Sequence, residues 1–145
     1  MYALSLFGPV DALLEPVIGF LLLGLVLANL AVRGLAFRSH KREASEGGAE
    51  AISRYLPLEA ANVVLILGSF YFMTLEHHAG IVLSVLVLGM FISDFFEFEA
   101  RKVEARRDVP LEPPNSAIAA SVLVLLYAGY VSLFFVIEPL WNAII

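Results

Sequence analysis

The stretch PVIGFLLLGLVLANLAVRGLAF at residues 16–37, followed at once by the basic run RSHKR at residues 38–42, decides the fold. A helix needs roughly 20 apolar residues to cross the hydrocarbon core of a bilayer, and this stretch has about that length. Three further apolar stretches follow it. The predicted fold is therefore an all-α integral membrane protein, a four-transmembrane-helix bundle forming one domain over residues 1–145, with spans at about 16–37, 58–75, 80–98 and 116–137.

The composition supports lipid as the solvent for most of the chain. Hydrophobic residues make up 60% of it, more than the core of an ordinary soluble domain can bury. The net charge of -5 argues against nucleic acid as a partner, because phosphate contacts need a concentrated basic face. The absence of cysteine excludes disulfides, thiolate metal sites and cysteine catalysis. We expect no cofactor.

The basic residues indicate how the helices are oriented. All nine lie in or beside two segments between apolar stretches: Arg33, Arg38, Lys41, Arg42 and Arg54, then Arg101, Lys102, Arg106 and Arg107. Cytoplasmic loops retain Lys and Arg, whereas translocated loops are depleted of them. We therefore expect a multi-pass protein of the cell membrane, with loops 38–57 and 99–115 in the cytoplasm and both termini outside.

The residues at the ends of the spans predict where each helix begins and stops. Pro16 suits the first helical position, where its missing N–H is harmless. The short segment 76–79 predicts a tight hairpin between the second and third spans. The third helix should continue past its apolar part into the cytosol, and Glu138-Pro139 should end the fourth. Residues 1–10 are expected to lie along the membrane interface.

Small residues recur at four-residue spacing on three of the predicted spans. Such residues let two helix backbones approach closely, which is how membrane helices associate. We therefore predict a compact bundle that packs through them, or that associates with itself or with other membrane subunits. The pairs are Gly24 and Ala28, Gly89 and Ser93, Ala117 and Ser121, and Ala128 and Ser132.

The chain also resembles itself. Shifting it by 61 residues aligns Glu15 with Glu76, Gly19 with Gly80, Phe37 with Phe98, and Lys41 with Lys102. These matches lie at both ends of the span, where apolar composition does not force them. They predict two tandem, parallel-oriented helix hairpins, residues 14–76 and 75–138, related by a pseudo-two-fold axis along the membrane normal. Chance similarity between apolar segments is the alternative.

Asp94 and Glu97 are the first candidates for chemistry, with Glu59 as a possible third member. Acids at membrane depth are expensive and often serve ion or proton handling. The same residues also have a structural explanation. Arg33 is the repeat counterpart of Asp94, so an Arg33–Asp94 ion pair could instead hold the first and third spans together.

An acid–histidine cluster at the opposite surface is the second candidate. Glu76, His77 and His78 carry carboxylate and imidazole groups that suit Zn²⁺ or Cu²⁺, and Glu15 and Glu138 could complete a ligand set. Neighbouring side chains on a turn diverge, however, and a plain polar turn explains them equally well.

No sequence motif points to a known family or to a catalytic constellation. The leading hypothesis is a non-catalytic polytopic membrane protein, either an accessory or assembly subunit of a membrane complex or a self-associating bundle. The alternative is a small oligomeric cation- or proton-coupled transporter or channel that uses Asp94 and Glu97.

Overall fold

The computed structural model describes residues 8–144, except for the side chains of residues 135–137. This part of the chain is helical and contains no strand. Its elements are α1 (Pro9–Leu14), α2 (Ile18–Gly47), the 3-10 turn η2 (Ala49–Ala51), α3 (Leu56–Leu75), α4 (His77–Arg106) and α5 (Asn115–Ile144). Most of the interfacial segment predicted at residues 1–10 lies outside the described residues.

Four helices are long and apolar enough to cross a membrane: α2, α3, α4 and α5 as far as Phe134. Apolar side chains cover the outside of the bundle as well as its inside. Leu27 and Leu67 are more than half exposed, whereas Val26 and Leu65 on the same helices are fully buried. A helix at the surface of a soluble protein normally turns a polar face outward. The all-helical fold with four such helices is confirmed, and it suggests a multi-pass membrane protein.

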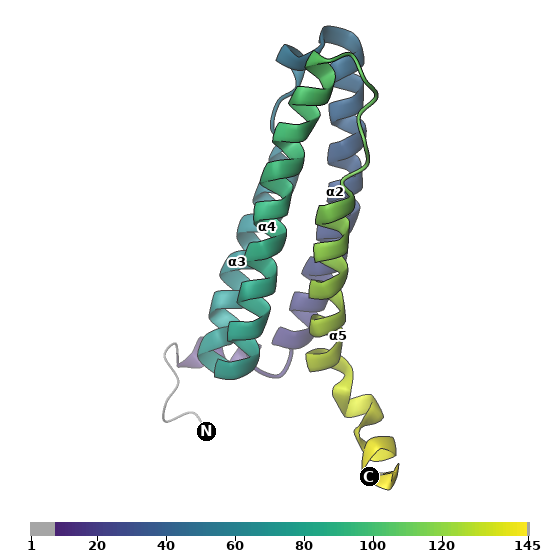
Figure 1. The fold of residues 1–145 in the computed structure, drawn as a ribbon. Coiled ribbons are helices and arrows are strands. Elements are labelled where there is room, and N and C mark those ends of the chain that lie inside the picture. The colour runs from purple at the N-terminus through teal and green to yellow at the C-terminus, as the bar shows by residue number, and fades with distance from the viewer. Residues whose placement is uncertain (1–7, 145) are drawn as a thin grey trace.

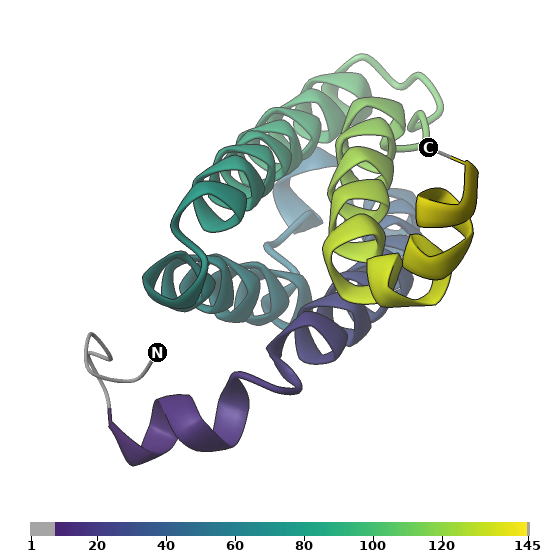
Figure 2. The same ribbon diagram turned by 90° about the horizontal axis from the view of Figure 1, so that it is seen from below.

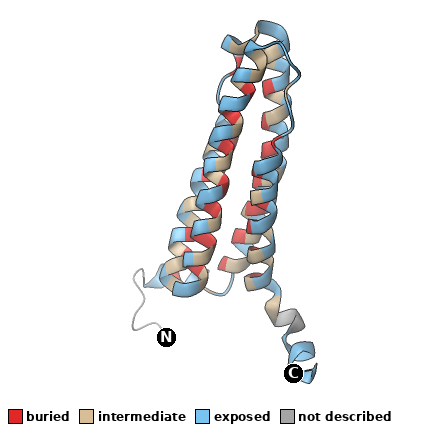
Figure 3. Cartoon of the chain, in the orientation of Figure 1, coloured by how far each residue is buried: buried red, intermediate tan, exposed pale blue. Residues whose placement is uncertain are grey.

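The four long helices form a ring. Each packs against its neighbours in sequence, and α5 closes the ring against α2 (Figures 1 and 2). Helices α2 and α4 therefore face each other across the bundle, as do α3 and α5. Buried residues line the inward faces (Figure 3). The fully buried apolar core contains Leu22, Val26, Leu65, Leu83, Val87, Met90 and Val124.

The ends of the helices follow local chemistry. The predicted extension of the third span is present, because α4 continues to Arg106. It stops where Asp108 adopts a positive φ of 56° and prolines follow. The hairpin turn is shorter than predicted, since only Glu76 separates α3 from α4. We call the end of the bundle with this turn the acidic end, and the end with residues 38–55 and 99–115 the basic end.

Two prolines correct the predicted boundaries. Pro16 lies in the linker between α1 and α2 and does not begin the long helix, which starts at Ile18. Pro139 lies inside α5 and does not end it. A proline inside a helix removes one backbone hydrogen bond and clashes with the carbonyl group four residues earlier, which bends the helix. The last part of α5 accordingly turns away from the bundle (Figure 1).

The small residues fall into two groups. Ala117, Ser121, Ala128 and Ser132 are buried on α5, as expected of packing residues. Gly24, Ala28 and Gly89 instead face outward, and Ser93 is half-buried. The four-residue spacing identified a face of small residues on α2 and α4 but not the direction in which that face points. Within this chain Gly24, Ala28 and Gly89 do not pack the bundle, and their packing against another chain stays a prediction.

Close backbone approach occurs at Gly80 instead, in the first turns of α4. A Cβ atom there would overlap the Cα atom of Met73 in α3, whereas a Cβ atom on Gly89 would meet nothing within 4 Å. We expect Gly80→Ala to destabilise the bundle by about 1–3 kcal/mol through overpacking. Gly89→Ala in the same helix has open space, so it should stabilise the bundle by up to about 1 kcal/mol, because alanine is the better helix former. Thermal unfolding in detergent, followed by circular dichroism, measures both; equal midpoints would contradict the close approach.

Candidate functional site

Five polar side chains meet inside the bundle, between its middle and the basic end. Asn29 and Arg33 come from α2, Asn62 from α3, Asp94 from α4 and Ser121 from α5. All are almost completely buried, and Asp94, at 9%, is the most exposed of them. Because every long helix contributes a member, this polar network connects all four helices.

The centre of the polar network is an ion pair across the ring. Arg33 Nε donates to Asp94 Oδ1 at 2.8 Å, and Arg33 Nη2 donates to Asp94 Oδ2 at 2.5 Å. These two parallel bonds are the bidentate arrangement that suits a guanidinium and a carboxylate. The structure therefore forms the ion pair that the repeat alignment allowed.

The remaining members satisfy both ions. Asn62 Nδ2 donates to Asp94 Oδ2 at 2.9 Å, and Asn29 Nδ2 donates to Asn62 Oδ1 at 2.6 Å. On the other side, Arg33 Nη1 donates to Ser121 Oγ at 2.6 Å, and the Ser121 hydroxyl donates to the carbonyl oxygen of Ala117. The carboxylate of Asp94 thus accepts three hydrogen bonds. Such satisfaction is what makes a buried ion pair tolerable.

The ion pair lies in the apolar part of the helices. Arg33 precedes Arg38, the next basic residue, by about 7.5 Å along the helix axis at 1.5 Å per residue. A single charge at that depth would be costly, whereas a hydrogen-bonded pair carries no net charge. The hydrogen bonds of this arrangement fix the positions of the four helices relative to one another along the bundle axis.

The other two candidate ion-site acids are used elsewhere. Glu97 Oε2 accepts hydrogen bonds from the backbone N–H and the hydroxyl group of Ser116, at 3.1 and 2.6 Å. It therefore satisfies one of the unpaired N–H groups at the start of α5. Glu59 lies 3.5 Å from Arg54 in a partly exposed salt bridge. Asp94 alone of the three is buried.

The acid–histidine cluster does not form a ligand set in the described part of the chain. Glu76, His77, His78 and Glu138 are exposed, and Glu15 is half-buried. Among residues 8–144, no three or more His, Asp or Glu side chains are grouped so that they could hold a metal ion. The physical reason is the one that weakened the prediction: consecutive side chains at a turn point in different directions.

Sequence reasoning missed a second buried polar contact, between His40 and Arg101. Arg101 Nη1 lies 2.9 Å from His40 Nδ1, and His40 Nε2 lies 2.9 Å from the carbonyl oxygen of Ser53. Both contacts are hydrogen bonds only if His40 is neutral with its proton on Nε2. His40 lies beyond the apolar stretch that ends at Phe37; burial and the neighbouring Arg101 lower its pKa.

A signal for this contact was present in the sequence. His40 and Arg101 are separated by 61 residues, the same offset that separates Arg33 and Asp94. The alignment of the chain with itself pairs both sets, but only Arg33 and Asp94 carry opposite charges, which is the pattern that indicates an ion pair.

A family model for a domain of unknown function, DUF7313, matches residues 2–145. The chain belongs to this family. No curated protein and no solved structure matches it. The match covers nearly the whole chain, so the polar network, the His40–Arg101 contact and both ends of the bundle all belong to the DUF7313 domain.

The polar network predicts how removal of one or both buried charges changes the stability of this DUF7313 domain. Asp94→Asn leaves Arg33 charged, buried and without its ion-pair partner, so we expect a loss of about 3–5 kcal/mol. Removing both charges with Arg33→Met and Asp94→Leu should cost less than the single change, because no charge is then buried alone. Glu99→Gln, on the exposed side of α4, is the control.

Unfolding in a detergent titration, followed by circular dichroism, measures all three variants. A double variant that is less stable than Asp94→Asn would contradict the ion pair as the centre of the network.

Proposed function

We propose that the protein is a small non-catalytic polytopic membrane protein, which acts as an accessory or assembly subunit of a membrane complex or associates with copies of itself. The observation that carries the proposal is the hydrogen bonding of Asp94 within the polar network. Asp94 accepts three hydrogen bonds from Arg33 and Asn62, so its charge serves to hold helices together. A carboxylate that carries an ion or a proton must instead exchange its partners during each cycle.

The positions of the other acids favour this function over transport. Glu97 is bonded to the start of α5, and Glu59 is paired with Arg54 at the basic end. The three candidate acids therefore have three separate structural partners and do not line one path. Transport would require the Arg33–Asp94 pair to open.

The outward small residues support association with another membrane helix. Gly24 and Ala28 lie on the outside of α2, and Gly89 lies on the outside of α4. Neither glycine has an atom within 4 Å of an added Cβ. Because apolar helices gain no hydrophobic drive from one another in lipid, close packing at small residues is the usual basis of their association.

We expect native mass spectrometry after purification in mild detergent to find the chain in fixed stoichiometry with itself or with other membrane subunits. Gly24→Leu should dissociate the chain from its partner, because the longer side chain blocks close approach of a second helix to the outer face of α2. Gly129→Leu, at another glycine with open space on α5, is the matched control and should leave the assembly intact. The same result for both variants would show that the α2 face is not the contact.

Flux measurements in liposomes test the alternative, which is that the protein is a transporter or channel. If the purified chain alone carried a proton- or cation-gradient-driven flux, and Asp94→Asn abolished it while the fold persisted, the non-catalytic proposal would be wrong. Glu138→Gln, at an exposed acid, controls for a general effect of charge.

We also infer that the basic end faces the cytoplasm and that both termini lie outside. Support comes from the charges: apart from Arg33, every Lys and Arg lies at the basic end, and the acidic end carries none. Retention of Lys and Arg on the cytoplasmic side then orients all four helices.

The orientation can be tested directly because the chain has no cysteine. His78 and Ser45 are both exposed and lie at opposite ends of the bundle. In intact cells, an impermeant thiol reagent should label His78→Cys and should label Ser45→Cys only after permeabilisation. The reverse pattern would overturn the orientation.

The arrangement as two tandem hairpins remains part of the proposal. Two buried contacts, Arg33–Asp94 and His40–Arg101, join residues that the 61-residue shift treats as equivalent. The same shift matches the buried Leu22 with Leu83. A two-fold axis between α2 and α4 would bring equivalent residues together in this way, which supports a duplicated hairpin.

A further inference from the structure

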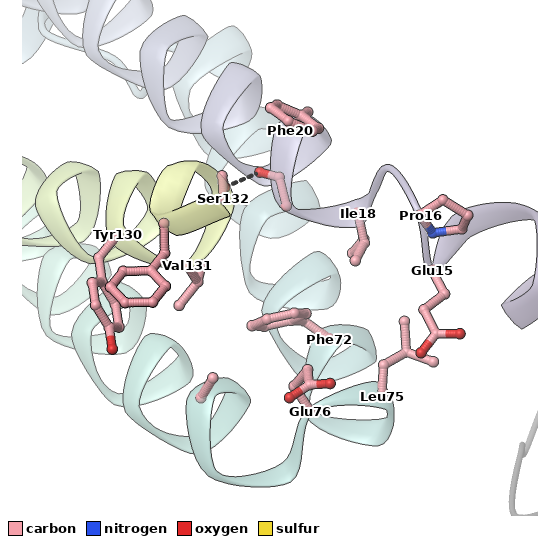
Figure 4. Close-up of a pocket in the computed structure, with 13 residues that line it drawn as sticks. Glu15, Pro16, Ile18, Phe20, Phe72, Leu75, Glu76, Tyr130, Val131 and Ser132 are labelled. Atoms are coloured by element: carbon pink, nitrogen blue, oxygen red, sulfur yellow. Dashed lines mark hydrogen bonds between the residues drawn. The ribbon is translucent and has the colours of Figure 1, made fainter. Parts of the chain in front are cut away.

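A cavity of about 430 Å³ opens at the acidic end of the bundle. Its walls come from the linker before α2, the start of α2, the turn between α3 and α4, and α5 (Figure 4). The volume falls within the range of small-molecule sites, about 300–1,000 Å³. The cavity lies at the other end of the bundle from the His40–Arg101 contact and shares no residue with the polar network.

The path of α5 explains why the cavity exists. The Ser132 hydroxyl donates to the carbonyl oxygen of Gly19 at 2.7 Å and holds α5 against α2 (Figure 4). This contact is close enough that a Cβ atom on Gly19 would lie 3.0 Å from Ser132 Oγ. Beyond it, α5 bends away from the bundle, and nothing in the described residues fills the space on the side of Phe72 and Ala79.

The lining combines apolar walls with unbalanced negative charge. Aromatic rings from Phe72 and Tyr130 and aliphatic groups such as Ile18 and Val131 form much of the surface. Glu15 and Glu76 supply two carboxylates, and no basic residue lines the cavity. Neither carboxylate forms a hydrogen bond or a salt bridge with another side chain in residues 8–144. Figure 4 shows both at the edge of the cavity near Leu75.

We propose that this cavity binds an organic cation with an apolar body, such as an aromatic or alkyl ammonium compound. Its apolar part would pack on Phe72 and the aliphatic walls, and its positive charge would lie near Glu15 and Glu76. Aromatic faces add attraction for a cation, and the effect is largest for cations that are weakly hydrated. Carboxylates next to an apolar wall attract such a cation more strongly than carboxylates in open water.

The same chemistry excludes two other classes of occupant. An anionic lipid headgroup would meet two carboxylates and no basic partner. A metal ion would need three or more converging ligands, and the described residues supply no such group here.

Tetraphenylphosphonium is a suitable probe, with tetraphenylborate as an anion of nearly the same shape. Equilibrium dialysis against the full chain in lipid nanodiscs measures binding of each, with empty nanodiscs correcting for partition into lipid. We expect saturable binding of the cation and none of the anion. The Glu15→Gln/Glu76→Gln double variant should weaken cation binding by about tenfold or more.

Two further variants separate the cavity from its surroundings. Glu138→Gln removes an acid that does not line the cavity, and it should leave the affinity unchanged. Ala79→Leu keeps both carboxylates but fills space in the cavity, and it should abolish binding. Circular dichroism confirms that each variant retains its helices. Equal binding of the anion, or undiminished cation binding by the double variant, would overturn the proposal.

Discussion

A guanidinium and a carboxylate buried among apolar side chains are each unstable alone, so the Arg33–Asp94 pair constrains everything around it. Its bidentate geometry fixes the rotation of α2 and α4 about their axes, because both side chains must point across the ring. Asn62 and Ser121 must then come from α3 and α5 at the same depth to satisfy the remaining groups. Apolar packing alone would tolerate several registers of four similar helices. A buried polar network tolerates few, because each alternative separates the charges of Arg33 and Asp94.

The position of this pair has a further consequence if the two hairpins are copies of each other. Equivalent residues can touch only near the axis that relates the copies, so identical residues there would place two arginines or two aspartates in contact. Arg33 opposite Asp94 removes that repulsion, and His40 opposite Arg101 does the same because a neutral imidazole can accept a hydrogen bond from a guanidinium. In this interpretation, the two halves differ in charge at these two contacts.

The sequence predicts the number and placement of the long helices, because the length of each apolar stretch can be read from the sequence alone. The alignment of the chain with itself also indicates the Arg33–Asp94 ion pair, as the structural explanation of Asp94. The sequence could not assign Gly24 and Gly89 to the outside of the bundle, since an apolar helix in lipid lacks the polar face that would reveal its rotation. The partners of Asp94 on α3 and α5 depend on that same rotation. Pro139 predicts the end of the last helix, but the helix bends and continues beyond it. The cavity is lined by residues that lie far apart in the sequence, from Glu15 to Phe134, so no local sequence pattern indicates it.

The two ends of the bundle are built to do different things. At the basic end, Glu97 holds the start of α5, and the polar network holds its next turns. At the acidic end, α5 is held by Ser132 and then departs, which leaves Glu15 and Glu76 beside an open cavity. A ligand there would contact Tyr130, Val131 and Phe134 of α5, on both sides of the Ser132 contact with α2, and would touch no member of the polar network. Binding at one end and assembly of the four helices at the other are thereby separable, which allows a small bundle to carry a ligand site without weakening its core.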